Sequence, residues 1–225
     1  MTQLTIPALF NFPPQAKVGR VLPKSKIYQH GRVSVALRES FVRQVEQITW
    51  QYKLAPETIN LLARGGIAEI QIFDIALKTD ALDEDVLRAV DRAIPLPIVF
   101  QLQHGQRIRM VAAHKRPSAA EAGKWVIDGY FAGAWQPAEA ERQPLPIALD
   151  LYSLYEQLLR SLLPQAARPG ENLPEQVERL TRLRSRQNEY DKLEARLRRE
   201  KQFNRKVELN AELRDIGTEI DQLSA

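Results

Sequence analysis

The order of secondary structure is easiest to follow in residues 67–115, which read IAEIQIFDIALKTDALDEDVLRAVDRAIPLPIVFQLQHGQRIRMVAAHK. Ile67–Lys78 is rich in isoleucine and partly alternating, which predicts a strand. Leu82–Ala93 has carboxylates in its first turn and apolar residues at helical spacing, which predicts a helix. Pro97–Gln103 and Arg107–Lys115 flank a short segment that contains glycine, so they are expected to form a hairpin.

The segments that follow extend this pattern. Lys124–Trp135 contains several aromatic and β-branched residues and predicts a third strand next to the hairpin. Leu149–Leu163 is strongly apolar and predicts a helix that covers the sheet. Because strands and helices are segregated instead of alternating regularly, the sequence favours an α+β fold, with a small, mostly antiparallel sheet covered by helices.

The region before residue 67 is expected to contain one helix and an irregular arm. Phe41, Val45, Ile48 and Tyr52 recur at spacings of three and four, which predicts a helix over Glu39–Tyr52. The first thirty residues contain four prolines, which lack an amide donor and have a fixed φ. They predict an irregular N-terminal arm that packs on the body.

The C-terminal quarter has a different composition. We expect a body over residues 1–165, a linker over 166–174 and a helical arm over 175–225. The arm lacks proline after its start and has two apolar stripes, separated by the charged segment 198–208. That interruption fits a stutter, a bend or a turn between helices, so the arm is either one long charged helix or a helical hairpin.

Composition narrows the range of chemistry. The 225 residues include no cysteine, which excludes disulfides, thiolate zinc sites, iron–sulfur clusters and cysteine nucleophiles. The three histidines are scattered, no phosphate-binding glycine loop or serine-nucleophile motif occurs, and no metal, cofactor or catalytic residue is predicted. The sequence shows neither a membrane-spanning run nor a signal peptide, so a cytoplasmic location without membrane association is expected.

Basic residues in the arm are the best candidates for binding. The formal net charge is +4, and cations cluster between residues 196 and 206. The side chains predicted to contact nucleic-acid phosphates are Arg196, Arg198, Arg199, Lys201, Arg205 and Lys206, together with Lys24 and Lys26 near the N-terminus. The alternative is a solvated helix face with ion pairs four residues apart, such as Glu194–Arg198.

The second apolar stripe suggests a protein contact. Its spacing of four and three predicts that a partner helix docks on Leu209, Leu213, Ile216 and Ile220. The same stripe is compatible with a homodimeric coiled coil. Both interpretations stay open at this point.

An enzymatic alternative is a divalent-metal nuclease. Asp74 and Lys115 would form its core, with Glu69 and Glu46 as further acids. However, the residue that precedes Lys115 by two is Ala113, where a carboxylate would be needed. Because a metal ion requires several oxygen ligands, this site is incomplete.

Several segments together resemble the bacterial family catalogued as domain of unknown function four-three-nine-one. They are VLPKSKIY from Val21, WQYKLAPETINL from Trp50, LDEDVLRAVDRAIPLPIVF from Leu82, AAHKRPS from Ala112 and LRREKQFNRKVELNAELR from Leu197. The resemblance carries no catalytic residue. It implies genes for DNA methyltransferases and helicases nearby, in restriction-modification or phage-defence clusters. The expected function is therefore that of a non-enzymatic accessory protein in such a DNA-modifying or helicase complex.

Overall fold

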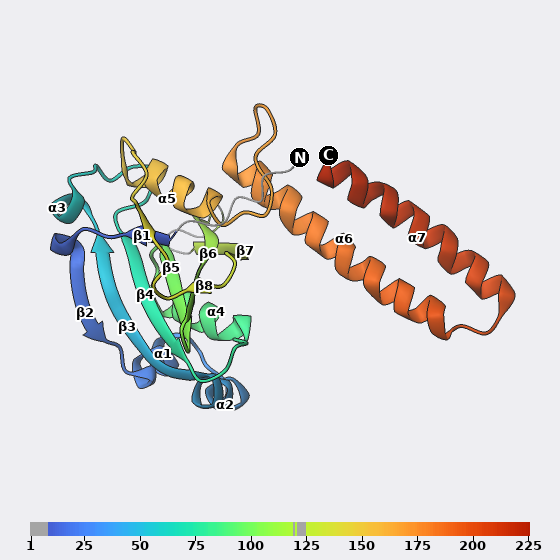
Figure 1. Ribbon diagram of the computed structural model, residues 1–225, viewed down its shortest axis with the longest axis horizontal. Coiled ribbons are helices and arrows are strands. Elements are labelled where there is room, and N and C mark those ends of the chain that lie inside the picture. The colour runs from blue at the N-terminus through green and yellow to red at the C-terminus, as the bar shows by residue number, and fades with distance from the viewer. Residues whose placement is uncertain (1–8, 119, 121–124) are drawn as a thin grey trace. The chain divides into compact units, whose positions relative to one another are not determined.

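The computed structural model describes residues 9–118, 120 and 125–225 (Figure 1). The chain divides into two compact units, Met1–Leu163 and Pro164–Ala225. We call the first unit the body and the second the hairpin unit. The predicted linker 166–174 falls within the second unit, whose first helix begins at Leu173. None of the helices in the described residues has the length and hydropathy needed to cross a lipid bilayer.

The body is built on one large, mostly antiparallel sheet. In the described residues its strands are β2 (Lys17–Val21), β3 (Val45–Leu54), β4 (Ile70–Leu77), β5 (Ile98–His104), β6 (Arg107–Pro117), β7 (Trp125–Ala132) and β8 (Gln136–Pro137). The order is β2-β3-β4-β5-β6-β7, and β8 pairs with β6. Of these pairs only β4 and β5 run parallel. The α+β prediction and the three-stranded meander β5-β6-β7 are confirmed.

Helix α4 (Glu84–Ala93), which the sequence predicted as Leu82–Ala93, makes the crossover between the two parallel strands. Asp83 caps its N-terminus by accepting a hydrogen bond from the amide of Asp85, at 3.0 Å. Its apolar side packs on the sheet together with α1 (Lys24–His30) and α2 (Val35–Gln44). The core beneath these helices includes Phe41, Phe73 and Phe100.

Smaller elements complete the body. Helix α5 (Leu151–Arg160), predicted as Leu149–Leu163, begins at Asp150, whose carboxylate accepts a hydrogen bond from the amide of Ser153. Strands β1 (Leu9–Asn11) and β9 (Arg142–Pro144) form a separate parallel pair. Helix α3 (Pro56–Ile59) follows β3.

The prediction of an irregular arm over the first thirty residues is wrong for its described part. Residues 9–30 contain β1, the short 3-10 helix η1 (Pro14–Ala16), β2 and α1. The prolines stand at helix starts, where the missing amide costs no helical hydrogen bond: Pro14 begins η1 and Pro23 precedes α1. Residues 1–8 of the predicted arm lie outside the described residues.

The helix predicted over Glu39–Tyr52 is wrong in its second half. Helix α2 begins after Ser34, which caps it, and ends at Gln44, and β3 then runs through Val45–Leu54. The register of β3 shifts between Val45 and Gln47 and again between Trp50 and Tyr52. Each irregularity interrupts the two-residue alternation of a strand, so the apolar positions imitate the spacing of a helix.

The hairpin unit consists mainly of two long helices, α6 (Leu173–Arg199) and α7 (Phe203–Ser224). Of the alternatives that the sequence left open, the structure has a turn between helices at residues 200–202 (Figure 1). Asn172 caps α6 and exchanges hydrogen bonds with Glu175. Arg186 links the two helices, because its Nε lies 2.8 Å from a carboxylate oxygen of Glu219.

Candidate functional site

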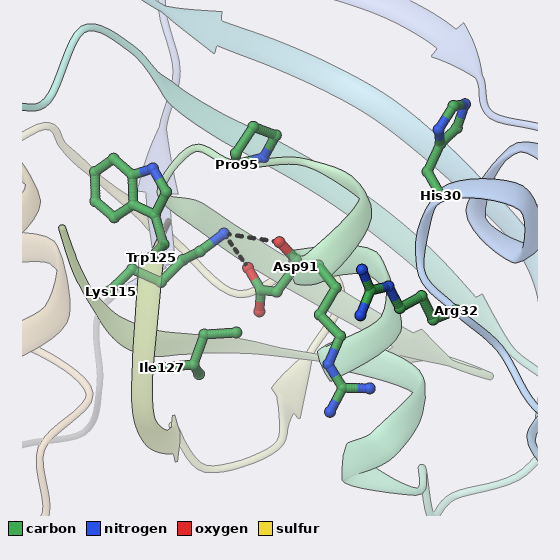
Figure 2. Close-up of a pocket in the computed structure, with 8 residues that line it drawn as sticks. His30, Arg32, Asp91, Pro95, Lys115, Trp125 and Ile127 are labelled. Atoms are coloured by element: carbon green, nitrogen blue, oxygen red, sulfur yellow. Dashed lines mark hydrogen bonds and ion pairs between the residues drawn. The ribbon is translucent and has the colours of Figure 1, made fainter. Parts of the chain in front are cut away.

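A cleft of about 510 Å³ opens in the body beside the C-terminal end of α4 (Figure 2). Its walls come from four places in the chain: the turn after α1, the end of α4, strand β6 and strand β7. The lining residues are His30, Arg32, Asp91, Arg92, Pro95, Lys115, Trp125 and Ile127.

A buried ion pair forms the floor of this cleft. The Nζ of Lys115 lies 2.9 Å from Oδ1 of Asp91, and each side chain is only 1% exposed. The same ammonium group donates to the carbonyl oxygens of Ile94, at 3.0 Å, and Leu96, at 2.6 Å. These carbonyls follow the last turn of α4, so Lys115 places its charge at the negative end of that helix.

Two tyrosines extend this buried network. The hydroxyl of Tyr130 donates to the second carboxylate oxygen of Asp91. The hydroxyl of Tyr155 accepts from the amide of Lys115, at 2.9 Å, and donates to the carbonyl of Ala113. Both backbone groups lie where the register of β6 shifts, between Ala113 and Lys115. The three protons of the Lys115 ammonium group have acceptors in Asp91 and in the carbonyls of Ile94 and Leu96. The floor is therefore a structural network.

Burial governs the titration of this network. It raises the pKa of Asp91, although Lys115 and Tyr130 act in the opposite direction. Burial also lowers the pKa of Lys115 and raises the pKa of Tyr130. The charges of Asp91 and Lys115 are thus stabilised by direct protein partners instead of water. Both groups use their hydrogen-bonding capacity on those partners.

The walls differ from the floor because their polar groups are free. His30, Arg32 and Arg92 are exposed, and none of their side chains has a hydrogen bond or ion pair with another described residue. Figure 2 shows His30 and Arg32 on one side of the cleft and Trp125 on the other, with Asp91 and Lys115 between them. The cleft therefore has a saturated floor, a basic wall and an aromatic wall.

Sequence patterns alone did not reveal this cleft. His30 is one of three scattered histidines, Arg92 lies in the predicted helix Leu82–Ala93, and Trp125 lies in the predicted strand Lys124–Trp135. The lining residues are brought together by the crossover helix and by the return of β7 along β6. The one local signal is Gly31 between His30 and Arg32, which by itself indicates only a turn.

The structure does not bring Asp74 and Lys115 together. Phe73 and Ile75 pack in the core beneath α4, so strand alternation directs Asp74 to the opposite face of the sheet. There it accepts a 2.6 Å hydrogen bond from Gln101, and burial raises its pKa. Lys115 instead reaches Asp91 on α4.

The other acids of the nuclease alternative are also apart. Glu69 accepts a hydrogen bond from Gln71 and pairs with Lys53, while Glu46 is exposed at the start of β3. Among the described residues, no group of three or more histidines and acids could hold a metal ion.

Of the two N-terminal lysines predicted to bind phosphates, Lys24 is already engaged. Its Nζ donates to the carbonyl of Val45, at 2.5 Å, and to that of Phe41, at the end of α2. Burial lowers its pKa. Lys26, in contrast, is exposed on α1.

The six basic residues predicted in the arm gather around the turn between α6 and α7. We call residues 196–206 the hairpin tip. All six side chains are exposed, and Glu200 is the only acid in this segment. Arg198 alone among them has an ion pair with another described residue, at 3.0 Å from Glu194. Phe203, at the start of α7, is 78% exposed.

The acid in the hairpin tip supports the turn. One carboxylate oxygen of Glu200 accepts from the amides of Lys201, at 2.8 Å, and Gln202, at 2.9 Å. These two hydrogen bonds lower the pKa of Glu200. Glu200 thus ties the backbone of the turn and leaves the neighbouring cations facing solvent.

The apolar stripe that was predicted to dock a partner lies within the hairpin unit. Leu209, Leu213 and Ile216 are buried, and Ile220 is half-buried. The two helices lie side by side along their length (Figure 1), which gives the stripe an intramolecular partner. Docking of another chain on this stripe would require α7 to leave α6.

A family model described as Domain of unknown function (DUF4391) matches residues 10–220. The chain belongs to this family. The matched range includes most of the body and of the hairpin unit. No curated protein and no solved structure matches the chain.

Proposed function

We propose that this protein binds nucleic acid through the hairpin tip and acts as a non-enzymatic accessory protein of a DNA-modifying or helicase complex. The observation that carries the proposal is the set of five exposed cations at the tip that have no carboxylate within 4.0 Å among the described residues. They are Arg196, Arg199, Lys201, Arg205 and Lys206.

The opposite end of the hairpin unit provides an internal comparison. Near the start of α6 Arg179 pairs with Glu171, and in the middle of the helix Arg186 pairs with both Glu189 and Glu219. Of the three arginines in the last turn of α6, only Arg198 has an ion pair among the described residues. A solvent-exposed helix face without a binding partner would have ion pairs along its whole length. The excess of positive charge at the hairpin tip therefore favours an anionic partner.

The chemistry of the tip suits a polyphosphate backbone. Long basic side chains on a narrow projection neutralise phosphates and release counterions without reading base edges. Phe203 adds an exposed ring on which an unpaired base stacks. The tip therefore favours contact with the backbone and with single-stranded regions over recognition of a particular sequence.

The accessory role is supported by where the residues of the nuclease alternative lie. The buried Lys115 and Asp91 are occupied by each other, and Asp74 lies on the opposite face of the sheet. The family resemblance implies helicases or DNA methyltransferases as the proteins with which this chain works. In that role the tip would hold nucleic acid while the partner carries out the reaction.

The test is fluorescence anisotropy with labelled duplex and single-stranded DNA over a series of salt concentrations. The triple variant R199Q/K201Q/R205Q removes three tip cations that have no ion pair. The control variant K17Q/R43Q/R64Q removes three exposed cations from the body. Each lowers the formal net charge from +4 to +1, because three positive charges are removed.

The tip variant should bind DNA more weakly and reduce the slope of log Kd against log salt by roughly 2–3, because each phosphate that is no longer neutralised lowers this slope by about 0.9. The control variant should keep the slope of the unmodified protein. Equal weakening in both variants would mean that only total charge matters, and unchanged binding in the tip variant would overturn the proposal.

A further inference from the structure

The cleft in the body has an excess of positive charge that no neighbouring residue neutralises. Asp91 offsets Lys115 on its floor, while Arg32 and Arg92 on its wall are unpaired among the described residues. The C-terminal ends of α1 and α4 each contribute a negative partial charge of up to about 0.5. The cleft therefore retains an excess of about one positive charge.

The turn that carries Arg32 is held firmly in place. A Cβ on Gly31 would lie 2.6 Å from the carbonyl oxygen of Ala89 on α4, so only glycine allows this approach. Arg32 then adopts φ 52°, in the left-handed region that is unfavourable for a residue with a side chain. The backbone thus accepts strain of about 1 kcal/mol or more at Arg32, which lines the cleft.

The opposite wall offers a flat apolar surface. Trp125 and Ile127 lie two residues apart on β7, so both side chains project from the same face of the sheet. Trp125 is half-buried, and Pro95 closes the cleft beside it. A planar ring can stack on the indole while a negative group on the same molecule reaches the guanidinium groups.

We propose that this cleft binds a nucleoside monophosphate. Its phosphate would be held by Arg32 and Arg92, its base would stack on Trp125, and the structural Asp91–Lys115 pair would keep the floor rigid. A volume of about 510 Å³ is sufficient for a ligand of this size. The proposed site is separate from the hairpin tip and does not depend on its binding nucleic acid.

The test is isothermal titration calorimetry of the full-length protein with AMP, CMP, adenosine and inorganic phosphate. The monophosphates should bind, and adenosine and phosphate should each bind at least about tenfold more weakly, because each lacks one of the two interactions. R32Q and R92Q should each weaken AMP binding by about tenfold, and W125L by about fivefold.

Controls separate this site from the tip and from folding. R43Q removes an exposed cation outside the cleft and should leave AMP binding unchanged. R199Q/K201Q/R205Q should also keep AMP affinity, and R32Q should keep DNA affinity. Near-ultraviolet circular dichroism checks that each variant is folded.

Three results would overturn the proposal. One is the absence of AMP binding at millimolar concentration, and another is phosphate binding as tight as that of AMP. The third is AMP affinity that is equal in R32Q, R92Q and the unmodified protein. Loss of AMP binding only in the tip variant would transfer the nucleotide site to the hairpin unit.

Discussion

The body and the hairpin unit each contain a buried ion pair, and the pKa of the acid is shifted in opposite directions in the two pairs. In the body, the Asp91 and Lys115 side chains are 1% exposed, and burial raises the pKa of the acid and lowers that of the lysine. In the hairpin unit, the Glu171 and Arg179 side chains are 9% and 7% exposed. Hydrogen bonds from Arg179 lower the pKa of Glu171 to about 2.

The difference reflects how each unit is held together. The body has a sheet and three helices that enclose an apolar core, so a charge inside it is almost completely shielded from water. The hairpin unit is mainly a helix pair. Arg179 joins its parts by donating to Glu171, to Gln165 and to the carbonyl of Leu223 at the end of α7. Charged hydrogen bonds thus close the hairpin unit where a deep core is absent.

The largest expected effect follows from removing one charge of the body's pair. D91A should lower the free energy of unfolding by about 3–5 kcal/mol, because the ammonium of Lys115 would be left buried without its carboxylate. Urea unfolding followed by tryptophan fluorescence measures this, since Trp50, Trp125 and Trp135 are the only tryptophans and all lie in the body.

The double variant D91L/K115M sharpens the comparison. It removes both charges, and it should be clearly more stable than D91A because no uncompensated charge remains. If the double variant were as unstable as D91A, the hydrogen bonds from Lys115 to the carbonyls, and not its charge balance, would dominate this region of the body.

Local sequence signals were sufficient for the centre of the sheet. Strand β4, helix α4 and the β5-β6 hairpin each combine a periodic pattern with a clear start or turn, and the structure confirms them. Strand β3 was mistaken for a helix because its irregularities break the alternation. The N-terminal strand β2 was missed because its stability comes from pairing with β3, which is not visible in its own residues.

The second-largest expected effect concerns the Glu171–Arg179 ion pair of the hairpin unit and depends on pH. The pKa of Glu171 is about 2 in the folded protein and about 4.3 in an unfolded chain, so its contribution to stability is complete above pH 5. That contribution disappears as the pH falls from about 5 to 2, because protonation then favours the unfolded chain.

E171Q should therefore destabilise the hairpin unit by about 2 kcal/mol at neutral pH, the value of a charge-assisted pair of hydrogen bonds. Urea unfolding followed by circular dichroism at 222 nm is the measurement. The difference between E171Q and the unmodified protein should shrink toward pH 2. A difference that stays constant over this range would show that the pair is held by packing instead of charge.

The two candidate sites also differ in how far each could be predicted from the sequence. The hairpin tip is one continuous segment, so the density of its basic residues was visible in the sequence. The cleft joins the turn after α1, the end of α4 and the strand β7, and no local pattern relates these segments. The partner of Lys115 likewise depends on the crossover, which placed Asp91 beside it and left Asp74 on the other face.

The last comparison concerns one glycine in each unit, and the smallest expected effect is that of G217A. A Cβ on Gly217 in α7 would meet only Tyr190, at 3.8 Å, which is an ordinary van der Waals distance. Because glycine is unfavourable within a helix, G217A should stabilise the hairpin unit by about 0.5–1 kcal/mol.

G31A should instead destabilise the body by about 1–3 kcal/mol, because the added methyl group meets the backbone of α4. Circular dichroism at 222 nm for the first variant and tryptophan fluorescence for the second would measure these shifts. A stabilising G31A would mean that α1 and α4 can separate, and the close packing that directs Arg32 into the cleft would then not be required by the fold.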